Sequence, residues 1–328
     1  MKSSRILALL VLGTSQALAI PVLFSGWGAG QFGLVAATPT VNLAGNVTGT
    51  GGIQDGVIGV NTGVDLALSS GTVTGAIDFA DAASKSTGGS CAADAGGVCK
   101  VNTNSVFTGG TVTGVTLQYT AAVSNAVTEW NNLVAASAWG SNTGAMAVNL
   151  GSGSSGYVLC AGSGQTGCTT TNTTTTTRTV NGQTQTAYLF DISTTTGGVV
   201  NQTVTIKGDG STLVVLLYNG ASTLNLSKSV SLTGLSADQV LLNVTSAGGI
   251  TTSAGFTYTG ALAVKDTTEV LTGASINGRL YLGGTSSATL NSGFSLTSPT
   301  DLATPEPATE VLIGSALVAL VVLSRKLR

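Results

Sequence analysis

Short runs in which aliphatic residues alternate with hydroxyl-bearing residues recur along most of the chain. Segments 71–78 and 110–117 both begin with the motif Gly-Thr-Val-Thr-Gly. An alternation with a period of two is typical of β-strands that bury one face and expose the other. Glycine at the ends of such runs is typical of corners, where the backbone needs a positive φ or a close approach. The pattern predicts a mainly β protein with aliphatic side chains inside and Thr and Ser outside.

These runs recur at a roughly constant interval. Segments 255–264 and 273–282 align at a shift of 18 residues, and Leu241 begins a run of the same phase about 20 residues earlier. A repeat of this length with short strands predicts a stacked, parallel β-solenoid, in which each coil pairs with the coils on either side of it. In the last repeat, we expect Leu280 to point into the solenoid and Tyr281 to lie outside.

One segment has a helical period instead. Between residues 119 and 139, the apolar residues recur at helical spacing; they are Val123, Ala126, Val127, Trp130, Leu133 and Val134. Gly140 supplies a stop signal. We expect an amphipathic helix packed along the flank of the solenoid.

A Gly/Ser/Thr-rich insertion follows at 141–185, which we expect to cap a solenoid end or to project as a flexible loop. Four cysteines form two C-x7-C pairs: Cys91 with Cys99, and Cys160 with Cys168. Export favours disulfides within each pair. The alternative is a four-thiolate zinc site, although zinc sites usually have shorter ligand spacings.

The N-terminus reads as a secretory signal peptide. Lys2 and Arg5 precede the apolar stretch 6–12, and Ala17 and Ala19 form a small-x-small cleavage site. The alternative is an uncleaved anchor, for which the apolar stretch is short. We therefore expect residues 1–19 to be a cleaved signal peptide.

The C-terminus carries a three-part signal. Pro305, Glu306 and Pro307 precede the apolar run Val311–Leu323, and the basic residues Arg325, Lys326 and Arg328 follow it. The 13-residue run would form a helix of about 20 Å. A full membrane span needs about 20 residues, so this is a marginal or transient transmembrane helix with its cations in the cytoplasm. The alternative is a terminal core helix.

This tail resembles the PEP-CTERM sorting signal of Gram-negative bacteria. One departure is Glu310, an acid beside the apolar run. The resemblance implies that an exosortase processes the chain at an inner-membrane intermediate. The chain would then be delivered to the cell surface or extracellular matrix, where exopolysaccharide or other biofilm-matrix components are its implied partners.

The body, residues 20–300, resembles the ice-binding-like and adhesin-like β-solenoids and the related choice-of-anchor surface domains. The similarity is greatest in the segment 273–282. The resemblance implies a right-handed solenoid of triangular cross-section with a long helix alongside. The expected organisation is a signal peptide, a β-solenoid body and a sorting segment, 301–328.

Composition argues against most other functions. The body holds 7 Lys or Arg and 11 Asp or Glu, and charged residues make up only 8% of the chain, against about 25% in ordinary domains. No basic patch exists for nucleic acid. Because the chain has no His, a Ser-His or Cys-His nucleophile is excluded.

Two carboxylate pairs could in principle act as acid and base in a polysaccharide-degrading enzyme, Asp78 with Asp81 and Asp266 with Glu269. The surrounding sequence is poor in the aromatic residues that bind sugars, so we expect no enzyme activity, no cofactor and no metal. The sequence favours an exported structural or adhesive protein. The alternative is an ice-binding protein that orders water on outward Thr-rich segments such as 251–253 and 257–259.

Overall fold

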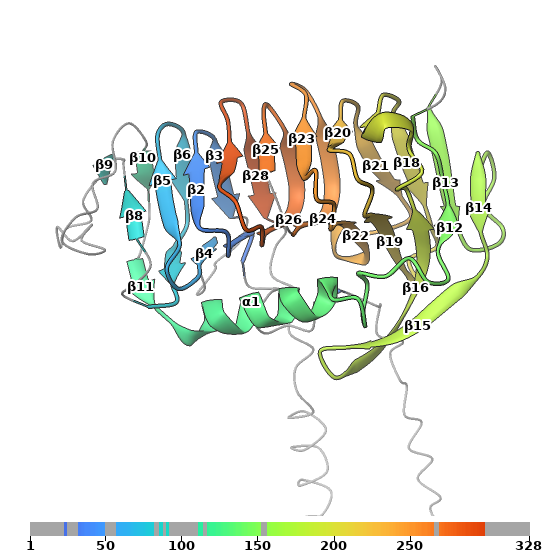
Figure 1. Ribbon diagram of the computed structural model, residues 1–328, viewed down its shortest axis with the longest axis horizontal. Helices are drawn as coiled ribbons and strands as arrows, with labels where there is room; N and C mark the ends of the chain where they lie inside the picture. Colours follow the sequence, from blue (N-terminus) through green and yellow to red (C-terminus); the bar gives the residue numbers. More distant parts are fainter. Residues whose placement is uncertain are drawn as a thin grey trace, which may run out of the picture.

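The computed structural model describes residues 23–24, 32–49, 57–81, 85–87, 90–91, 111–113, 117–151, 156–265 and 269–298. Within these residues the fold is mainly β, with mostly parallel strand pairing and one α-helix, α1 (Ala121–Val134). Short strands stack in successive coils along one axis, as the repeat predicts (Figure 1). The handedness of the coils stays a prediction. The signal peptide and the sorting segment lie outside the described residues, and no described helix is long and apolar enough to cross a membrane.

Most coils contribute strands to three faces. The first is the helix-covered face, made of β11 (Leu117–Tyr119), β7 (Ile77–Phe79), β4 (Ile58–Val60), β1 (Leu34–Ala36), the second halves of β26 (Ser275–Leu282) and β24 (Thr257–Val264), β22 (Val240–Val244), β19 (Leu213–Tyr218), β16 (Gln183–Asp191) and β12 (Met146–Ala147). Strand β15 (Thr175–Val180) pairs antiparallel with β16 and extends it.

The second face continues around the corner in the same sheet. It consists of β9 (Ser90–Cys91), β10 (Thr111–Thr113), β6 (Thr72–Thr74), β3 (Asn46–Gly49), β28 (Ser295–Ser298), the first halves of β26 and β24, β21 (Val230–Thr233), β18 (Val204–Lys207), β13 (Tyr157–Ala161) and β14 (Thr170–Asn172).

The third face is a separate sheet. Its order is β8 (Lys85–Thr87), β5 (Asp65–Leu68), β2 (Thr40–Leu43), β27 (Ala288–Leu290), β25 (Glu269–Leu271), β23 (Ile250–Thr252), β20 (Leu224–Leu226) and β17 (Val199–Val200). Two short 3₁₀ turns, η2 (Thr196–Gly198) and η3 (Ala237–Gln239), lie in connections between strands.

The register confirms the repeat seen in the sequence. Strands β24 and β26 pair at a shift of 18 residues, Thr257 with Ser275. Gly260 and Gly278 sit side by side where both strands bend from the second face to the first. Their φ angles are 139° and 157°, and a Cβ on Gly278 would lie 1.9 Å from the Gly260 carbonyl oxygen, so only glycine fits there.

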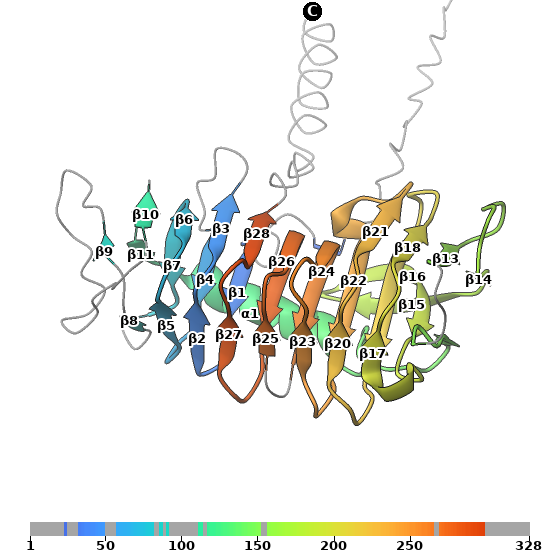
Figure 2. The same cartoon turned by 90° about the horizontal axis from the view of Figure 1, so that it is seen from above.

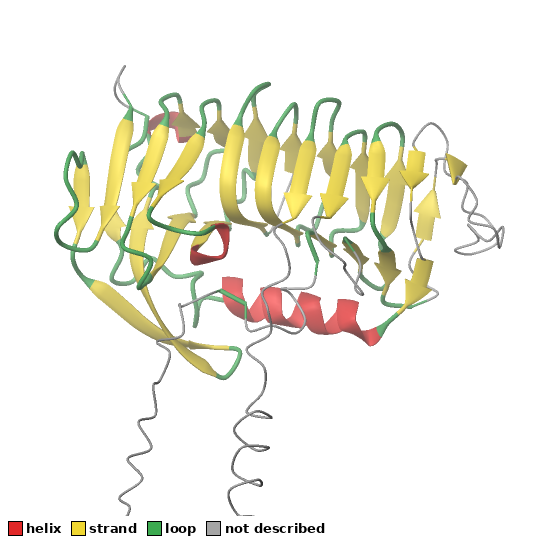
Figure 3. Ribbon diagram, turned by 180° about the vertical axis from the view of Figure 1, so that it is seen from behind, coloured by secondary structure: helices red, strands yellow, loops and turns green. Residues whose placement is uncertain are grey.

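The coils are not stacked in the order of the sequence. The N-terminal strand β1 lies between β4 and the late strand β26, and β2 and β3 likewise pair with β27 and β28. After β11, α1 runs along the solenoid, and the chain resumes at the far end with β12 and works back toward β1 (Figures 1 and 3). The two halves of the chain therefore meet at a seam, defined here as the pairs β1–β26, β2–β27 and β3–β28.

The helix buries the predicted stripe of six residues against the first face. The hydroxyl of Thr120 caps its N-terminus by accepting from the Ala122 amide at 3.1 Å. The helix ends at Val134 instead of reaching the predicted stop near Gly140, because Ala135 is extended and the chain then turns Trp139 into the core. The Trp139 amide still bonds back to the Leu133 carbonyl at 3.1 Å.

Because α1 covers this face, residues that point out of the solenoid there are still buried. Leu280 packs inside the solenoid, as predicted. Tyr281 points to the other side but is 1% exposed, since its ring stacks on Trp130 at 5.3 Å and its hydroxyl donates to Asn131. Tyr281 therefore lies outside the solenoid, as the register predicts, but the helix shields it from solvent, which the sequence did not predict.

Candidate functional site

The second face carries two rows of small polar side chains, which we call the threonine face. The first row is Thr72, Asn46, Ser295, Ser275 and Thr257. The second row is Thr74, Thr48, Thr297, Asn277, Thr259, Ser231 and Thr205. Figure 2 shows strands of this face, among them β6, β3, β28, β21 and β18, side by side.

The period of two in each strand explains the rows. Between the two outward residues of each strand lies an inward residue that joins the core, for example Val73, Val47, Leu296 and Ile276. Parallel pairing in register then places each outward residue beside its equivalent in the next coil. Every position of both rows is exposed or half-buried.

The geometry of a parallel sheet fixes the spacing of these groups. Neighbouring strands lie about 4.8 Å apart, and outward residues two positions apart on one strand are separated by about 6.6 Å. Hydroxyls interact along the rows: Ser295 Oγ donates to Ser275 Oγ at 3.0 Å, and the hydroxyls of Thr205 and Ser231 lie 3.3 Å apart. The result is a two-row array of hydroxyl, amide and methyl groups with regular spacing.

No residue of the two rows is ionisable, so the array has no group for acid–base or nucleophilic catalysis. Lys207 follows Thr205 two positions along β18, at one end of the face. Its ammonium donates to the Thr166 carbonyl at 2.9 Å, which holds the charge beside the loop after β13.

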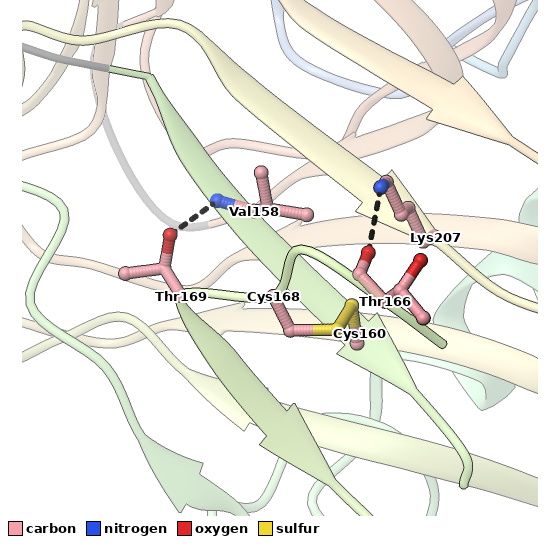
Figure 4. Close-up of a disulfide and its surroundings, with 6 residues drawn as sticks. All are labelled: Val158, Cys160, Thr166, Cys168, Thr169 and Lys207. Carbon is pink, nitrogen blue, oxygen red and sulfur yellow. Dashed lines mark hydrogen bonds between the residues drawn. A yellow bond between two sulfur atoms is a disulfide. The ribbon is translucent and has the colours of Figure 1, made fainter. Parts of the chain in front are cut away.

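A disulfide fastens this end of the face (Figure 4). Cys160 and Cys168 are bonded to each other, the pairing that the local spacing favours. The bridge closes the loop between β13 and β14 and holds β14 beside β13 as the last strand. The Thr169 hydroxyl also accepts from the Val158 amide at 3.0 Å. The second expected bridge, Cys91 to Cys99, lies outside the described residues.

The carboxylates considered for catalysis do not form an exposed pair. Asp78 is fully buried in β7, whereas Asp81 lies beyond that strand and accepts from the Thr62 hydroxyl at 2.9 Å. Asp266 lies outside the described residues. Glu269 is fully buried in β25, and burial raises the pKa of its carboxyl group to about 9.

The two Thr-rich segments proposed from the sequence lie on different faces. Thr257 and Thr259 belong to the threonine face. Thr251 lies on the third face, and the neighbouring Thr252 points inward, where its hydroxyl donates to the Thr272 carbonyl. The sequence interpretation did not include Thr72, Thr74, Asn46 or Thr48, although the Gly-Thr-Val-Thr-Gly motif at 71–75 carries the same alternation.

Comparison with known proteins finds only distant structural similarity. No family model matches the chain, and no curated protein matches it significantly. Among solved structures, an ice-binding protein from an Antarctic biological consortium has a TM-score of 0.42 and 15% identity, with 87% of this chain and 93% of that chain covered. An ice-binding protein from the Arctic yeast (LeIBP) has a TM-score of 0.39 and 15% identity, over 86% and 97% of the two chains.

A third, from the Antarctic ascomycete Antarctomyces psychrotrophicus, has a TM-score of 0.35 and 14% identity, over 84% and 99%. All three are ice-binding proteins. At these scores they transfer no residue role to this chain, so the functional argument depends on its own surface.

Proposed function

We propose that the protein is a non-enzymatic ice-binding protein, and that the threonine face is the surface that adsorbs to ice. The observation that supports this most directly is the unbroken pair of uncharged rows on one face of parallel strands. Ice presents a neutral, periodic array of hydrogen-bond donors and acceptors. A matching surface needs groups that both donate and accept at fixed spacing, and the hydroxyls of Thr and Ser do both.

Rigidity supports the same proposal. The strands that carry the rows are hydrogen-bonded on both sides, and their inward residues are packed in the core. The side chains are therefore ordered before binding, which reduces the entropy cost of adsorption. The methyl groups of Thr add apolar surface that releases ordinary hydration water on contact.

Adhesion to another protein is supported less well by this face. Residues that dominate protein–protein binding are enriched in Trp, Tyr and Arg. Neither row contains one of these residues. A surface of small neutral groups is better suited to an ordered water lattice than to a protein partner.

Substitution at the centre of the face tests the proposal. Thr297 lies in β28, with Thr48 on one side and Asn277 on the other. We expect Thr297→Tyr to abolish most of the thermal hysteresis of the wild-type protein, because the ring lifts the face from the ice surface. The measurement is the gap between melting and freezing points in a nanolitre osmometer.

Thr289→Tyr provides the matched control. Thr289 is the outward residue of β27 in the same coil but on the third face. This variant should retain wild-type hysteresis. The proposal fails if the wild-type protein shows no hysteresis and no ice shaping, or if Thr297→Tyr is as active as Thr289→Tyr.

We also propose that the chain is exported and that an exosortase sorts it to the surface or matrix. Support comes from the sequence of the two ends, including the Pro305–Pro307 triplet and the basic terminus. Combined with ice adsorption, this would make the protein a surface component that attaches a cell or its matrix to ice. Exopolysaccharide is the matrix partner that this proposal implies.

A further inference from the structure

The antiparallel hairpin β15–β16 projects from the solenoid, and its first strand, β15, is a long edge strand. β15 pairs residue by residue with β16 from Thr175 to Val180. β16 pairs on its other side with β19, so within the described residues β15 is the outermost strand of this extension (Figures 1 and 3).

The other strands at this end of the solenoid are much shorter. β12 and β17 have two residues each and β14 has three, whereas β15 has six. Very short edge strands are a common way to prevent pairing between copies, because they expose few backbone groups. β15 lacks this protection.

The composition of β15 also favours pairing. Its sequence, Thr-Thr-Thr-Arg-Thr-Val, is rich in β-branched residues and contains neither Pro nor Gly. Thr175, Thr177 and Thr179 are exposed on one side of the hairpin. The only charged residue in the strand is Arg178, whose side chain lies on the other side of the hairpin. A free charge on an edge strand would oppose pairing with a second copy.

Arg178 is held away from that exposed side. Its guanidinium donates to the carbonyl oxygens of Ala138, Ser141 at 3.2 Å and Thr143 at 2.9 Å. It also lies 5.3 Å from the centre of the Trp139 ring. These contacts satisfy the cation within its own chain.

The hairpin is fixed to the helix as well. Asn181, at the turn, donates to the Glu129 carbonyl at 3.2 Å and accepts from Asn132 at 2.9 Å. Trp139 Nε1 donates to Gln185 Oε1 at 3.2 Å. The edge is therefore ordered before any partner arrives, which lowers the entropy cost of association.

We propose that the edge of β15 is a self-association site, where β15 of a second copy pairs antiparallel across a two-fold axis. The backbone donors and acceptors of one strand edge complement those of another strand. Antiparallel pairing of identical strands gives a closed dimer, the commonest form of homo-oligomer. Threonines on the exposed side would then face threonines of the second copy, a favourable cross-strand pair.

The test is the molar mass of the full chain in solution, measured by light scattering after size exclusion across a series of micromolar concentrations. We expect the wild-type protein to reach the mass of a dimer. Thr177→Lys/Thr179→Lys should remain a monomer, because the antiparallel pairing brings the added like charges together. Hydrogen exchange at residues 175–180 of the wild-type protein should slow as the concentration rises.

Ser124→Lys/Thr128→Lys is the matched control. It adds the same charge at exposed positions of α1 and should dimerise like the wild-type protein. A monomeric wild-type protein would overturn the proposal. A dimer that persists in Thr177→Lys/Thr179→Lys would also overturn it, since association would then involve another segment.

Discussion

Glu269 is a buried acid, and burying its charged carboxylate costs free energy. Its side chain lies inside the solenoid, where Oε1 accepts from the Gly284 amide at 3.1 Å and Oε2 has no hydrogen-bond partner. Burial disfavours the charged form and raises the pKa from 4.5 to about 9. At neutral pH the folded protein therefore holds a proton here that the unfolded chain has lost.

This proton makes stability depend on pH. Because the folded state binds the extra proton between about pH 4.5 and 9, the free energy of unfolding falls as the pH rises through that window. The slope from this one group approaches about 1.4 kcal/mol per pH unit. We expect Glu269→Gln to remove this slope and to raise the melting temperature at pH 8 more than at pH 5.

Urea unfolding and thermal melts of the wild-type protein and Glu269→Gln at pH 5, 6, 7 and 8 would measure the slope and the melting temperatures. The variant keeps the volume of the side chain and an acceptor for the Gly284 amide. If the two proteins lose stability in parallel as the pH rises, Glu269 is not the group responsible.

At the scale of elements, the end strand β14 depends on a covalent link. It has three residues, and most of the loop that leads to it from β13 is exposed. A cross-link of this kind stabilises mainly by restricting the unfolded chain. By keeping β14 paired with β13, the disulfide covers the edge of β13, which could otherwise pair with a strand of another molecule.

We expect Cys160→Ala/Cys168→Ala to lower the free energy of unfolding by about 2–3 kcal/mol, from the chain-entropy relation for a short loop. Hydrogen exchange should increase first in β14. Chemical unfolding and exchange of the variant beside the oxidised wild-type protein would measure both effects. A uniform increase across distant strands such as β5 would show that the link stabilises more than this end.

The elements themselves were largely predictable from the sequence because they depend on local periodicity. The stripe on α1 and the 18-residue register of β24 and β26 follow from spacing alone. The burial of Tyr281 did not follow, because it depends on where α1 packs. The early end of the helix did not follow either, since Trp139 leaves the helical path to reach the core.

At the scale of the whole molecule, the extent of the candidate site was hidden for a similar reason. Thr48 pairs with Thr297, 249 residues later, and no repeat in the sequence links the two segments. The alternation identified each strand but not which strands are neighbours. Only the seam assembles the two groups of strands into one face.

The proposed sorting concerns the whole chain, and it can be tested separately from folding. We expect replacement of Pro305, Glu306 and Pro307 by Ala to leave the protein in the inner membrane, because the recognition element is lost while the apolar run remains. Cell fractionation followed by immunoblotting would measure this in the native host. Undiminished delivery to the surface would contradict exosortase sorting.

The seam has a consequence for the order of events during synthesis. Strands β1, β2 and β3 emerge early, yet their partners β26, β27 and β28 are almost the last strands to be made. Contacts so distant in sequence slow folding, because the chain loses entropy before they form. The early strands can pair at once with β4, β5 and β6, but we expect their other edges to stay unpaired until translation is nearly finished. Under the proposed export, such a delay would keep the early part of the chain incompletely folded while it passes through a narrow secretion channel.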